Sequence, residues 1–253
     1  MKILYFTGSG NCLSVAKRFE AELLSIPQMI KNNILNIEDD VVGIIYPVYA
    51  ISVPNIVRKY LSKCTIKADY IFVIATYGFT DCGSLHEMKK VLKINNNRAD
   101  YYNSLLMVDN YIPFFNIEEQ LSKLKEKNIE NNLNKIIQDI NSKVKQEETC
   151  GFFNNLISSI GSKVVNKIEN FTPKMFYVNN ECILCGICKK VCPSANITQD
   201  DINKKPKFGN NCESCLACIH NCPRNAIHMK LQRSKKRFRN PEVSVNEIIK
   251  SNN

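Results

Sequence analysis

The sequence predicts an α/β protein with an open, doubly wound parallel sheet of five strands, followed by a small cysteine-rich domain. Two observations carry this prediction. Short apolar runs alternate with amphipathic stretches through residues 1–147, which is typical of a parallel sheet with helices on both faces. Beyond that segment, eight of the 12 cysteines fall between Cys182 and Cys222.

The expected strands are the apolar runs of the first 147 residues. Lys2–Phe6 opens the chain and meets a glycine-rich turn. Residues 41–46 and 70–77 are continuous apolar runs, as in strands that are buried on both faces of a sheet. Weaker strands are expected near residues 26–30 and 101–108, which brings the number to five.

Helices are expected between and after these strands. The apolar positions of residues 13–24 mostly follow the helical period, and shorter patterns of the same kind cover residues 56–61 and 85–92. From Ile117 to Val144 apolar residues recur every three or four positions, which predicts the last helix of the first domain. Residues 151–171 repeat this period and predict an interdomain helix.

The composition is that of a folded globular protein. Hydrophobic residues make up 44% and charged residues 23% of the 253 residues, enough apolar material for a core. No run approaches the roughly 20 apolar residues of a membrane-spanning helix, and the first six residues are too short a run for a signal peptide. We therefore expect a cytoplasmic protein. Thiols stay reduced there, so clustered cysteines more often bind metal than form disulfides.

The net positive charge, like the clustered cysteines, is concentrated in the second part of the chain. Residues 1–150 hold 18 Lys and Arg against 17 Asp and Glu, whereas residues 151–253 hold 16 against 7. From these shifts we expect four segments, which are a first domain (1–147), an interdomain helix and linker (148–174), a cysteine-rich domain (175–232) and a basic C-terminal tail (233–253).

The eight clustered cysteines repeat one spacing. Both halves read C-x2-C-x2-C-x3-C-P, and the second half begins 30 residues after the first. This doubled run is the spacing of bacterial ferredoxins that hold two [4Fe-4S] clusters. Structural zinc also favours paired C-x2-C motifs, but zinc gains nothing from a third cysteine at the same interval and a fourth before a proline.

The spacing also assigns the ligands of each cluster. Three closely spaced thiolates can wrap one face of a cubane, and the fourth, placed before the proline, reaches the other cluster. Cluster 1 is therefore expected to use Cys182, Cys185, Cys188 and Cys222, and cluster 2 to use Cys192, Cys212, Cys215 and Cys218. Residues 177–231 as a whole resemble the two-cluster bacterial ferredoxins, which implies a small α+β domain.

A glycine-rich turn, residues 7–11, follows the first expected strand. It places backbone N–H groups at the start of a helix, where a phosphate would be stabilised. The dinucleotide-binding pattern fails because its third glycine would stand at Leu13, and the chain has no G-x-x-x-x-G-K-[ST] motif. Neither a dinucleotide nor ATP is therefore favoured.

Residues 1–147 resemble the flavodoxin family, whose five-stranded doubly wound fold binds FMN through a first loop rich in Ser, Thr and Gly. The matching residues here are Thr7, Gly8, Ser9, Gly10 and Asn11. Cys12 replaces the usual Ser or Thr, and Ser14 is a candidate to supply the missing contact to the phosphate.

The same resemblance places the isoalloxazine ring of FMN against two further loops. These are the loops after the third and fourth strands, Pro47, Val48, Tyr49 and Ala50 in one and Thr76, Tyr77 and Gly78 in the other, with residues 81–83 close behind. Tyr49 and Tyr77 are the candidates for stacking, because the chain has no Trp. Each tyrosine could equally be a strand-end aromatic that covers the core.

Together the two parts resemble the fused flavodoxin–ferredoxin proteins of anaerobes. This resemblance implies an electron-transfer iron–sulfur flavoprotein that relays electrons between FMN and two [4Fe-4S] clusters for a redox partner, with no catalytic side chain of its own. Such a relay converts two-electron into one-electron chemistry. Whether the protein is an electron carrier or an oxidoreductase stays open, as does a homodimer in which one chain's flavin faces another's cluster.

Two alternatives remain at this point. In the first, the flavodoxin-like domain holds no flavin and serves a ferredoxin module as a docking scaffold, which the departure at Cys12 permits. In the second, the protein is a flavin-dependent reductase of a small molecule such as a quinone. Tyr49, Tyr77 and Asp81 are then the only acid–base groups expected near the ring.

The basic residues near the C-terminus suggest the kind of partner. Residues 230–239 contain six basic side chains and no acid. A solvated tail is the simplest interpretation. The functional interpretation is an acidic redox partner, because electrostatic steering raises the encounter rate of short-lived complexes. No nucleic-acid-binding motif accompanies the charge, so we expect no nucleic-acid partner.

Several cysteines and histidines have no expected role in a site. Cys64 and Cys150 are interpreted as incidental thiols. The three histidines, His86, His220 and His228, form no ligand spacing with one another.

Overall fold

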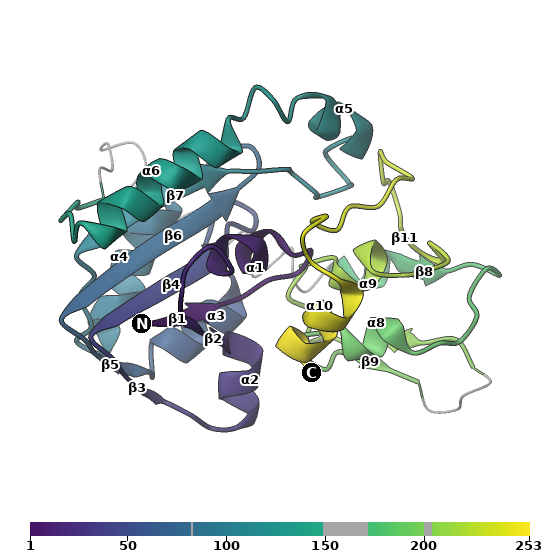
Figure 1. Ribbon diagram of the computed structural model, residues 1–253. Coiled ribbons are helices and arrows are strands. Elements are labelled where there is room, and N and C mark those ends of the chain that lie inside the picture. The colour runs from purple at the N-terminus through teal and green to yellow at the C-terminus, as the bar shows by residue number, and fades with distance from the viewer. Residues whose placement is uncertain (82, 149–171, 200–203) are drawn as a thin grey trace.

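The computed structural model describes residues 1–81, 83–148, 172–199 and 204–253. The interdomain helix expected at 151–171, together with Cys82 and Cys150, lies outside the described residues. The first domain is built on a five-stranded parallel sheet in the order β2-β1-β4-β6-β7 (Figure 1). Numbered by position along the chain, these strands have the order 2-1-3-4-5, which is the order of flavodoxin-like folds. The predicted fold class is confirmed.

The strands form where the apolar runs predict them, with one exception. Their bounds are β1 (Lys2–Tyr5), β2 (Glu22–Ser25), β4 (Val41–Pro47), β6 (Tyr70–Tyr77) and β7 (Tyr101–Leu106). β4 and β6 are the central strands and are buried along most of their length. A separate parallel pair, β3 (Asn36–Glu38) and β5 (Thr65–Lys67), lies outside this sheet.

The exception is the second strand. Residues 22–25 pair with β1, while residues 26–31, where a strand was expected, form helix α2 (Ile26–Lys31). Ser25 is the N-cap of α2, and a proline stands within its first turn, where the missing N–H of proline costs no hydrogen bond. Helix α1 (Asn11–Ala16) accordingly ends well before residue 24.

Helices cover both faces of the sheet. One face packs against α2, α3 (Asn55–Leu61) and α4 (Ser84–Ile94), through residues such as Met29, Tyr60 and Leu92. The other face packs against α1, α6 (Ile129–Asn141) and α10 (Val245–Asn252), through Leu13, Ile136 and Ile248. Each face therefore has its own apolar core.

The long helix expected from Ile117 to Val144 is two helices. α5 (Ile117–Ser122) ends before a turn, and α6 begins after Asn128, whose backbone is left-handed with φ +47°. The wider gap in the apolar pattern between Leu124 and Leu133 coincides with this turn. Only α6 packs on the sheet, because its buried residues recur at helical spacing.

The cysteine-rich domain has an internal repeat. One half holds α8 (Ile187–Lys190) and the other holds α9 (Ala217–His220), each following a cysteine loop. Two antiparallel pairs complete the domain, β8 (Phe176–Val178) with β11 (Ile227–Met229) and β9 (Ile197–Thr198) with β10 (Lys207–Phe208). A short 3-10 helix, Thr172–Met175, precedes β8.

The last segment is not the solvated tail that its charge suggested. Residues 233–253, here called the C-terminal strap, return from the cysteine-rich domain to the sheet domain and bury Phe238, Val243 and Ile248. Helix α10 begins with a capping box between Ser244 and Glu247 and lies between the two domains (Figure 1). Burial of these apolar side chains therefore holds the strap against the protein, although the segment is strongly basic. Within the described ranges, no helix combines the length and apolarity needed to span a bilayer.

Candidate functional site

A cavity of about 530 Å³ lies between the sheet and the cysteine-rich domain. Four of its walls are the loops after β1, β4, β6 and β7, which meet because parallel strands end at the same edge of a sheet. The fifth wall is the segment Glu213–Leu216 of the second cysteine run. The two domains therefore enclose one site.

The structure brings together nearly all the residues expected to bind FMN. Those that line the cavity are Thr7, Gly8, Ser9, Asn11, Cys12, Pro47, Val48, Tyr49, Ala50, Thr76, Tyr77 and Gly78. Gly10 does not line it. Its φ of +103° turns the chain, and a Cβ at this position would lie 3.0 Å from Asn240 and Val243 of the C-terminal strap.

Hydrogen bonds from neighbouring segments fix the loop after β1. Inside the loop, Gly10 N–H donates to Thr7 Oγ1 at 3.0 Å. From the loop after β7, the Asn110 amide donates to Ser9 Oγ at 2.5 Å, and the Asn11 amide donates back to Val108 O at 3.3 Å. The polar groups of this loop are thus held in place by the protein itself.

Cys12 lines the cavity, whereas Ser14 does not. The Cys12 thiol lies 3.1 Å from Thr76 Oγ1 in the cavity wall, and burial raises the pKa of Cys12 to about 12, so the thiol is neutral. Ser14 is not part of the wall. Its hydroxyl donates to Asn11 O and accepts a hydrogen bond from Asn240 of the strap. Ser14 therefore does not compensate for Cys12.

The loop after β4 is strained and firmly anchored. Ala50 and Ile51 both have left-handed backbones, with φ of +44° and +63°, which is unusual for a β-branched residue. The buried carboxylate of Glu87 holds the end of this loop by accepting from Ser52 Oγ at 2.6 Å and from Val53 N–H at 2.9 Å. Arg58 pairs with the same carboxylate at 2.6 Å.

Tyr49 and Gly8 are in close contact where the loops after β4 and β1 meet. The ring of Tyr49 meets Phe6 edge-on, with centroids 6.1 Å apart. A Cβ at Gly8 would lie 2.7 Å from Cys215 O and 2.8 Å from Tyr49 Oη, so only glycine fits there. The loop after β1 thus packs directly on the second cysteine run.

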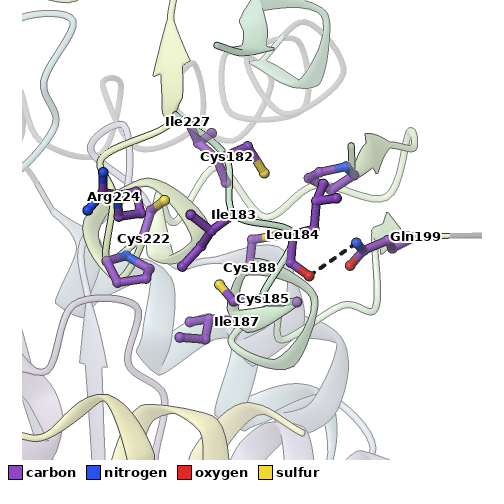
Figure 2. Close-up of a pocket in the computed structure, with 13 residues that line it drawn as sticks. Cys182, Ile183, Leu184, Cys185, Ile187, Cys188, Gln199, Cys222, Arg224 and Ile227 are labelled. Atoms are coloured by element: carbon purple, nitrogen blue, oxygen red, sulfur yellow. Dashed lines mark hydrogen bonds between the residues drawn. The ribbon is translucent and has the colours of Figure 1, made fainter. Parts of the chain in front are cut away.

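The eight cysteines divide into two sets, one around each of two small pockets. Cys182, Cys185, Cys188 and Cys222 line one pocket (Figure 2). Cys192, Cys212, Cys215 and Cys218 line the other. Each set therefore takes three cysteines from one run and one from the other. Among the residues that the structure describes, no three His, Cys, Asp or Glu side chains are arranged so that they could hold a single metal ion.

Backbone N–H groups already point at several of these sulfur atoms. Asn196 N–H lies 3.3 Å from Cys192 Sγ, Ser214 N–H lies 3.4 Å from Cys212 Sγ, and Ala226 N–H lies 3.2 Å from Cys222 Sγ. Such donors favour the thiolate form of the sulfur, which is the form that binds iron. The donor set and its surroundings fit iron–sulfur ligation.

The two pockets differ in their access to solvent. Cys185 is exposed, and its neighbour Ile183 is 58% exposed, so the first pocket opens to the surface. The second pocket shares Glu213, Cys215 and Leu216 with the interdomain cavity. Cys188 of α8 and Cys218 of α9 belong to one apolar core, which joins the two pockets.

Sequence reasoning missed the contribution of the segment after β7. Val108, Asp109, Asn110 and Tyr111 line the cavity, as do Phe79, Phe114 and Phe115, whereas Asp81, the carboxylate expected there, does not. One signal could have identified this segment. It follows the fifth strand of the parallel sheet and must therefore reach the same edge as the other loops.

His220, which had no expected role, holds this segment against α9. Its Nδ1 accepts from Phe238 N–H at 3.2 Å, so the proton is on Nε2, which donates to Asn110 O at 2.8 Å. Burial lowers the pKa of His220 to about 4, so the ring is neutral. The histidine thus links the cysteine-rich domain to the cavity wall.

Comparison with known proteins agrees with the cysteine geometry. The family model of the 4Fe-4S dicluster domain matches residues 162–238. Pyruvate synthase subunit PorD of Methanocaldococcus jannaschii is 30% identical over 73 residues, which cover 28% of this chain and 85% of that subunit. An uncharacterized ferredoxin of the same organism is 36% identical over 63 residues, 24% of this chain and 82% of the relative.

These matches define the class of the C-terminal part. The chain belongs to the family of 4Fe-4S dicluster ferredoxins through this part, and it carries a flavodoxin-like domain in front of it. It is therefore an iron–sulfur protein with a role in electron transfer.

Two solved structures are similar to the first domain. A Lactobacillus acidophilus flavoprotein in complex with FMN has a TM-score of 0.30 at 14% identity and covers 41% of this chain and 91% of its own. The Trp repressor binding protein of Bacillus subtilis has a TM-score of 0.29 at 14% identity and covers 42% of this chain and 83% of its own. The strand order, and not these likenesses, assigns the fold.

Proposed function

We propose that the protein is an electron-transfer iron–sulfur flavoprotein, in which FMN occupies the interdomain cavity and one [4Fe-4S] cluster occupies each cysteine pocket. The observation that carries this proposal is the shared wall of the cavity. The loop that resembles the flavodoxin phosphate loop and the segment Glu213–Leu216 of the second cysteine run face the same space. FMN exchanges two electrons with one partner and single electrons with another, whereas each cluster carries one.

The chemistry of the cavity supports FMN as its ligand. Hydroxyl and amide groups of Thr7, Ser9 and Asn11 lie at one part of the wall, where a phosphate needs donors. The rest of the wall is mainly apolar and aromatic, including Tyr49, Tyr77 and Phe115, as a planar ring system needs. Cys12 offers the phosphate only a neutral thiol, which makes it a weaker donor than the hydroxyl of Ser or Thr.

The arrangement of the pockets supports a linear route for electrons. Cluster 2, held by Cys192, Cys212, Cys215 and Cys218, would lie next to the flavin, since Cys215 lines both spaces. Cluster 1, held by Cys182, Cys185, Cys188 and Cys222, would lie next to cluster 2 and to solvent. We infer the order FMN, cluster 2, cluster 1 and then the external redox partner.

The surroundings of cluster 1 support an acidic partner. Lys189, Lys190 and Arg224 are exposed and belong to the loops and helix that form its pocket. Ile183, which lines the same pocket, adds an exposed apolar contact. Opposite charges on a partner would steer it toward the exposed cluster.

Anaerobic purification, followed by measurement of iron, acid-labile sulfide and flavin in one sample, tests the proposal. We expect about eight iron atoms, about eight sulfides and one FMN per chain. Full iron without flavin, even after FMN is added, would contradict the flavin relay and favour a ferredoxin with a docking domain. About four iron atoms would contradict the two-cluster assignment.

A further inference from the structure

Asp109 lies at the point where the loop after β7 meets the loop that is expected to face the flavin ring. Its side chain lines the cavity, and a Cβ at Gly78 would lie 2.3 Å from Asp109 Cβ, so these two loops are in direct contact. Asp109 Oδ1 accepts a hydrogen bond from Tyr111 N–H at 3.0 Å. In the part of the chain that the structure describes, Oδ2 has no hydrogen-bond partner. One carboxyl oxygen is therefore available to a ligand in the cavity.

A buried cation, Lys127, lies near Asp109. Lys127 is 8% exposed, and its Nζ donates to Gly78 O at 3.3 Å, on the same loop that Asp109 contacts. Burial lowers the pKa of Lys127, while the nearby Asp109 carboxylate raises it. A carboxyl and an ammonium that are both withdrawn from water beside a cofactor cavity are typical of acid–base sites.

We propose that Asp109 is the acid–base group of the cavity, which gives a proton to the bound flavin ring as the ring is reduced and takes it back as the ring is oxidised. This inference rests on the proposed function. With FMN and the clusters bound, two electrons from a one-electron donor protein would reach the ring singly. The O–H bond of Asp109 would break, an N–H bond would form on the ring, and the carboxylate left on Asp109 would be stabilised by the nearby Lys127. Solvent then returns the proton to Asp109.

The electrostatics of Asp109 suit this role. Burial raises the pKa of Asp109 to about 6, against the lowering effects of the Tyr111 N–H and of Lys127. The group therefore changes its protonation within the physiological range, as an efficient acid–base group needs. The neighbouring charges Lys123 and Glu126 act on Lys127 in opposite directions. On the facing loop, the titratable groups are Tyr77 and Asp81.

The other carboxyl on the wall, Glu213, belongs to the contact between the cysteine-rich domain and the sheet domain. Glu213 lies between two ligand cysteines, and its Oε2 accepts from Ile56 N–H at 3.0 Å at the start of α3. It therefore connects cluster 2 to the sheet domain. Asp109, in contrast, lies on the loop after β7, which contacts Gly78 of the loop expected to face the flavin ring.

Rapid mixing of the anaerobic, FMN-loaded protein with dithionite between pH 5 and pH 8 tests the proposal. In the wild type, the rate of flavin bleaching should fall as the pH rises through about 6, because Asp109 loses its proton. In Asp109→Asn the rate should be at least about tenfold lower at pH 5 and independent of pH over this range. Asp81→Asn is the matched control and should keep the wild-type profile.

A second variant should shift the pH dependence of flavin bleaching in a predictable direction. Lys127→Met removes the cation that lowers the pKa of Asp109, so the fall in rate should move to higher pH. Wild-type profiles in both Asp109→Asn and Lys127→Met, with FMN bound to each, would overturn the role of Asp109 and leave the relay intact. Failure of the wild type to bind FMN would contradict the proposed function and this inference together.

Discussion

At the scale of single residues, Asp109 lines the cavity, and its burial makes the ionised carboxylate unfavourable for folding. Its pKa is raised above the value of an unfolded chain, so its contribution to stability is full below pH ~4 and is lost as the pH rises through about 6. Asp109→Asn is neutral at every pH. At pH 8 we expect the variant to be more stable than the wild type by about 2 kcal/mol.

Urea unfolding of the holoprotein at pH 5 and pH 8, read by far-UV circular dichroism, measures this difference. The gap between Asp109→Asn and the wild type should widen toward pH 8, whereas Asp81→Asn should show no such widening. An equal gap at both pH values would contradict the assigned ionisation of Asp109.

Gly8 is the residue that sets the approach of the two domains. Gly8→Ala would place a Cβ 2.7 Å from Cys215 O, so the loop after β1 and the second cysteine run must separate. We expect a loss of stability of about 1–3 kcal/mol and weaker FMN binding by at least about tenfold, with full iron content. Flavin titration and iron analysis on the same sample check this. Unchanged FMN affinity would show that the loop relaxes without cost.

At the scale of elements, the C-terminal strap connects the loop after β1 to the cysteine-rich domain. Asn252 of α10 donates to Thr7 O at 3.2 Å and to Val191 O at 3.0 Å. Asn240 N–H donates to Ser9 O at 2.8 Å. These bonds span residues that are far apart in sequence, and together they help to hold the loop after β1 in place.

Asn252→Ala removes two of these bonds without removing the helix. We expect a loss of about 1–3 kcal/mol in unfolding free energy, because buried carbonyl groups lose their donor. FMN affinity should fall as well, since Thr7 belongs to the cavity wall. Asn253→Ala changes the neighbouring exposed asparagine and should match the wild type in thermal unfolding and flavin titration. Equal loss in both variants would point to general fraying of α10.

At the scale of the whole molecule, the proposed order of the redox centres rests on which spaces share a wall. Cys215→Ser should lose cluster 2, and Cys185→Ser should lose cluster 1, each leaving about four iron atoms per chain. If the order FMN, cluster 2, cluster 1 is right, reduced flavin reduces the remaining cluster in Cys185→Ser and fails to do so in Cys215→Ser. Electron paramagnetic resonance after photoreduction distinguishes the two. The reverse pattern would contradict the order.

The charge around cluster 1 makes a separate prediction about association. Lys190→Glu combined with Arg224→Glu should slow electron transfer to a purified acidic flavodoxin by about tenfold or more at low salt, with a smaller effect at high salt. Lys31→Glu combined with Lys93→Glu, at the exposed ends of α2 and α4, makes the same change of four charge units and should leave the rate unchanged. Equal effects of both substitutions would indicate that net charge alone governs association.

The sequence alone determined the features that depend on local spacing. Apolar runs predicted β1, β4, β6 and β7 because buried parallel strands are apolar on both faces. The cysteine spacing predicted the two ligand sets that line the two pockets, because the reach of a short loop limits which sulfurs can share a cluster. The glycine-rich turn after β1 was singled out in the same local way, and all its residues but Gly10 line the cavity.

Only the tertiary structure decided which distant segments meet. Asp81 stands nearer in sequence to the expected ring loop, but Asp109 lines the cavity, because the ends of parallel strands converge whatever their separation along the chain. The strap packs between the domains, although it is basic, because burial of Phe238, Val243 and Ile248 stabilises the packed position. Local patterns report what a segment can form, and long-range packing selects what it touches.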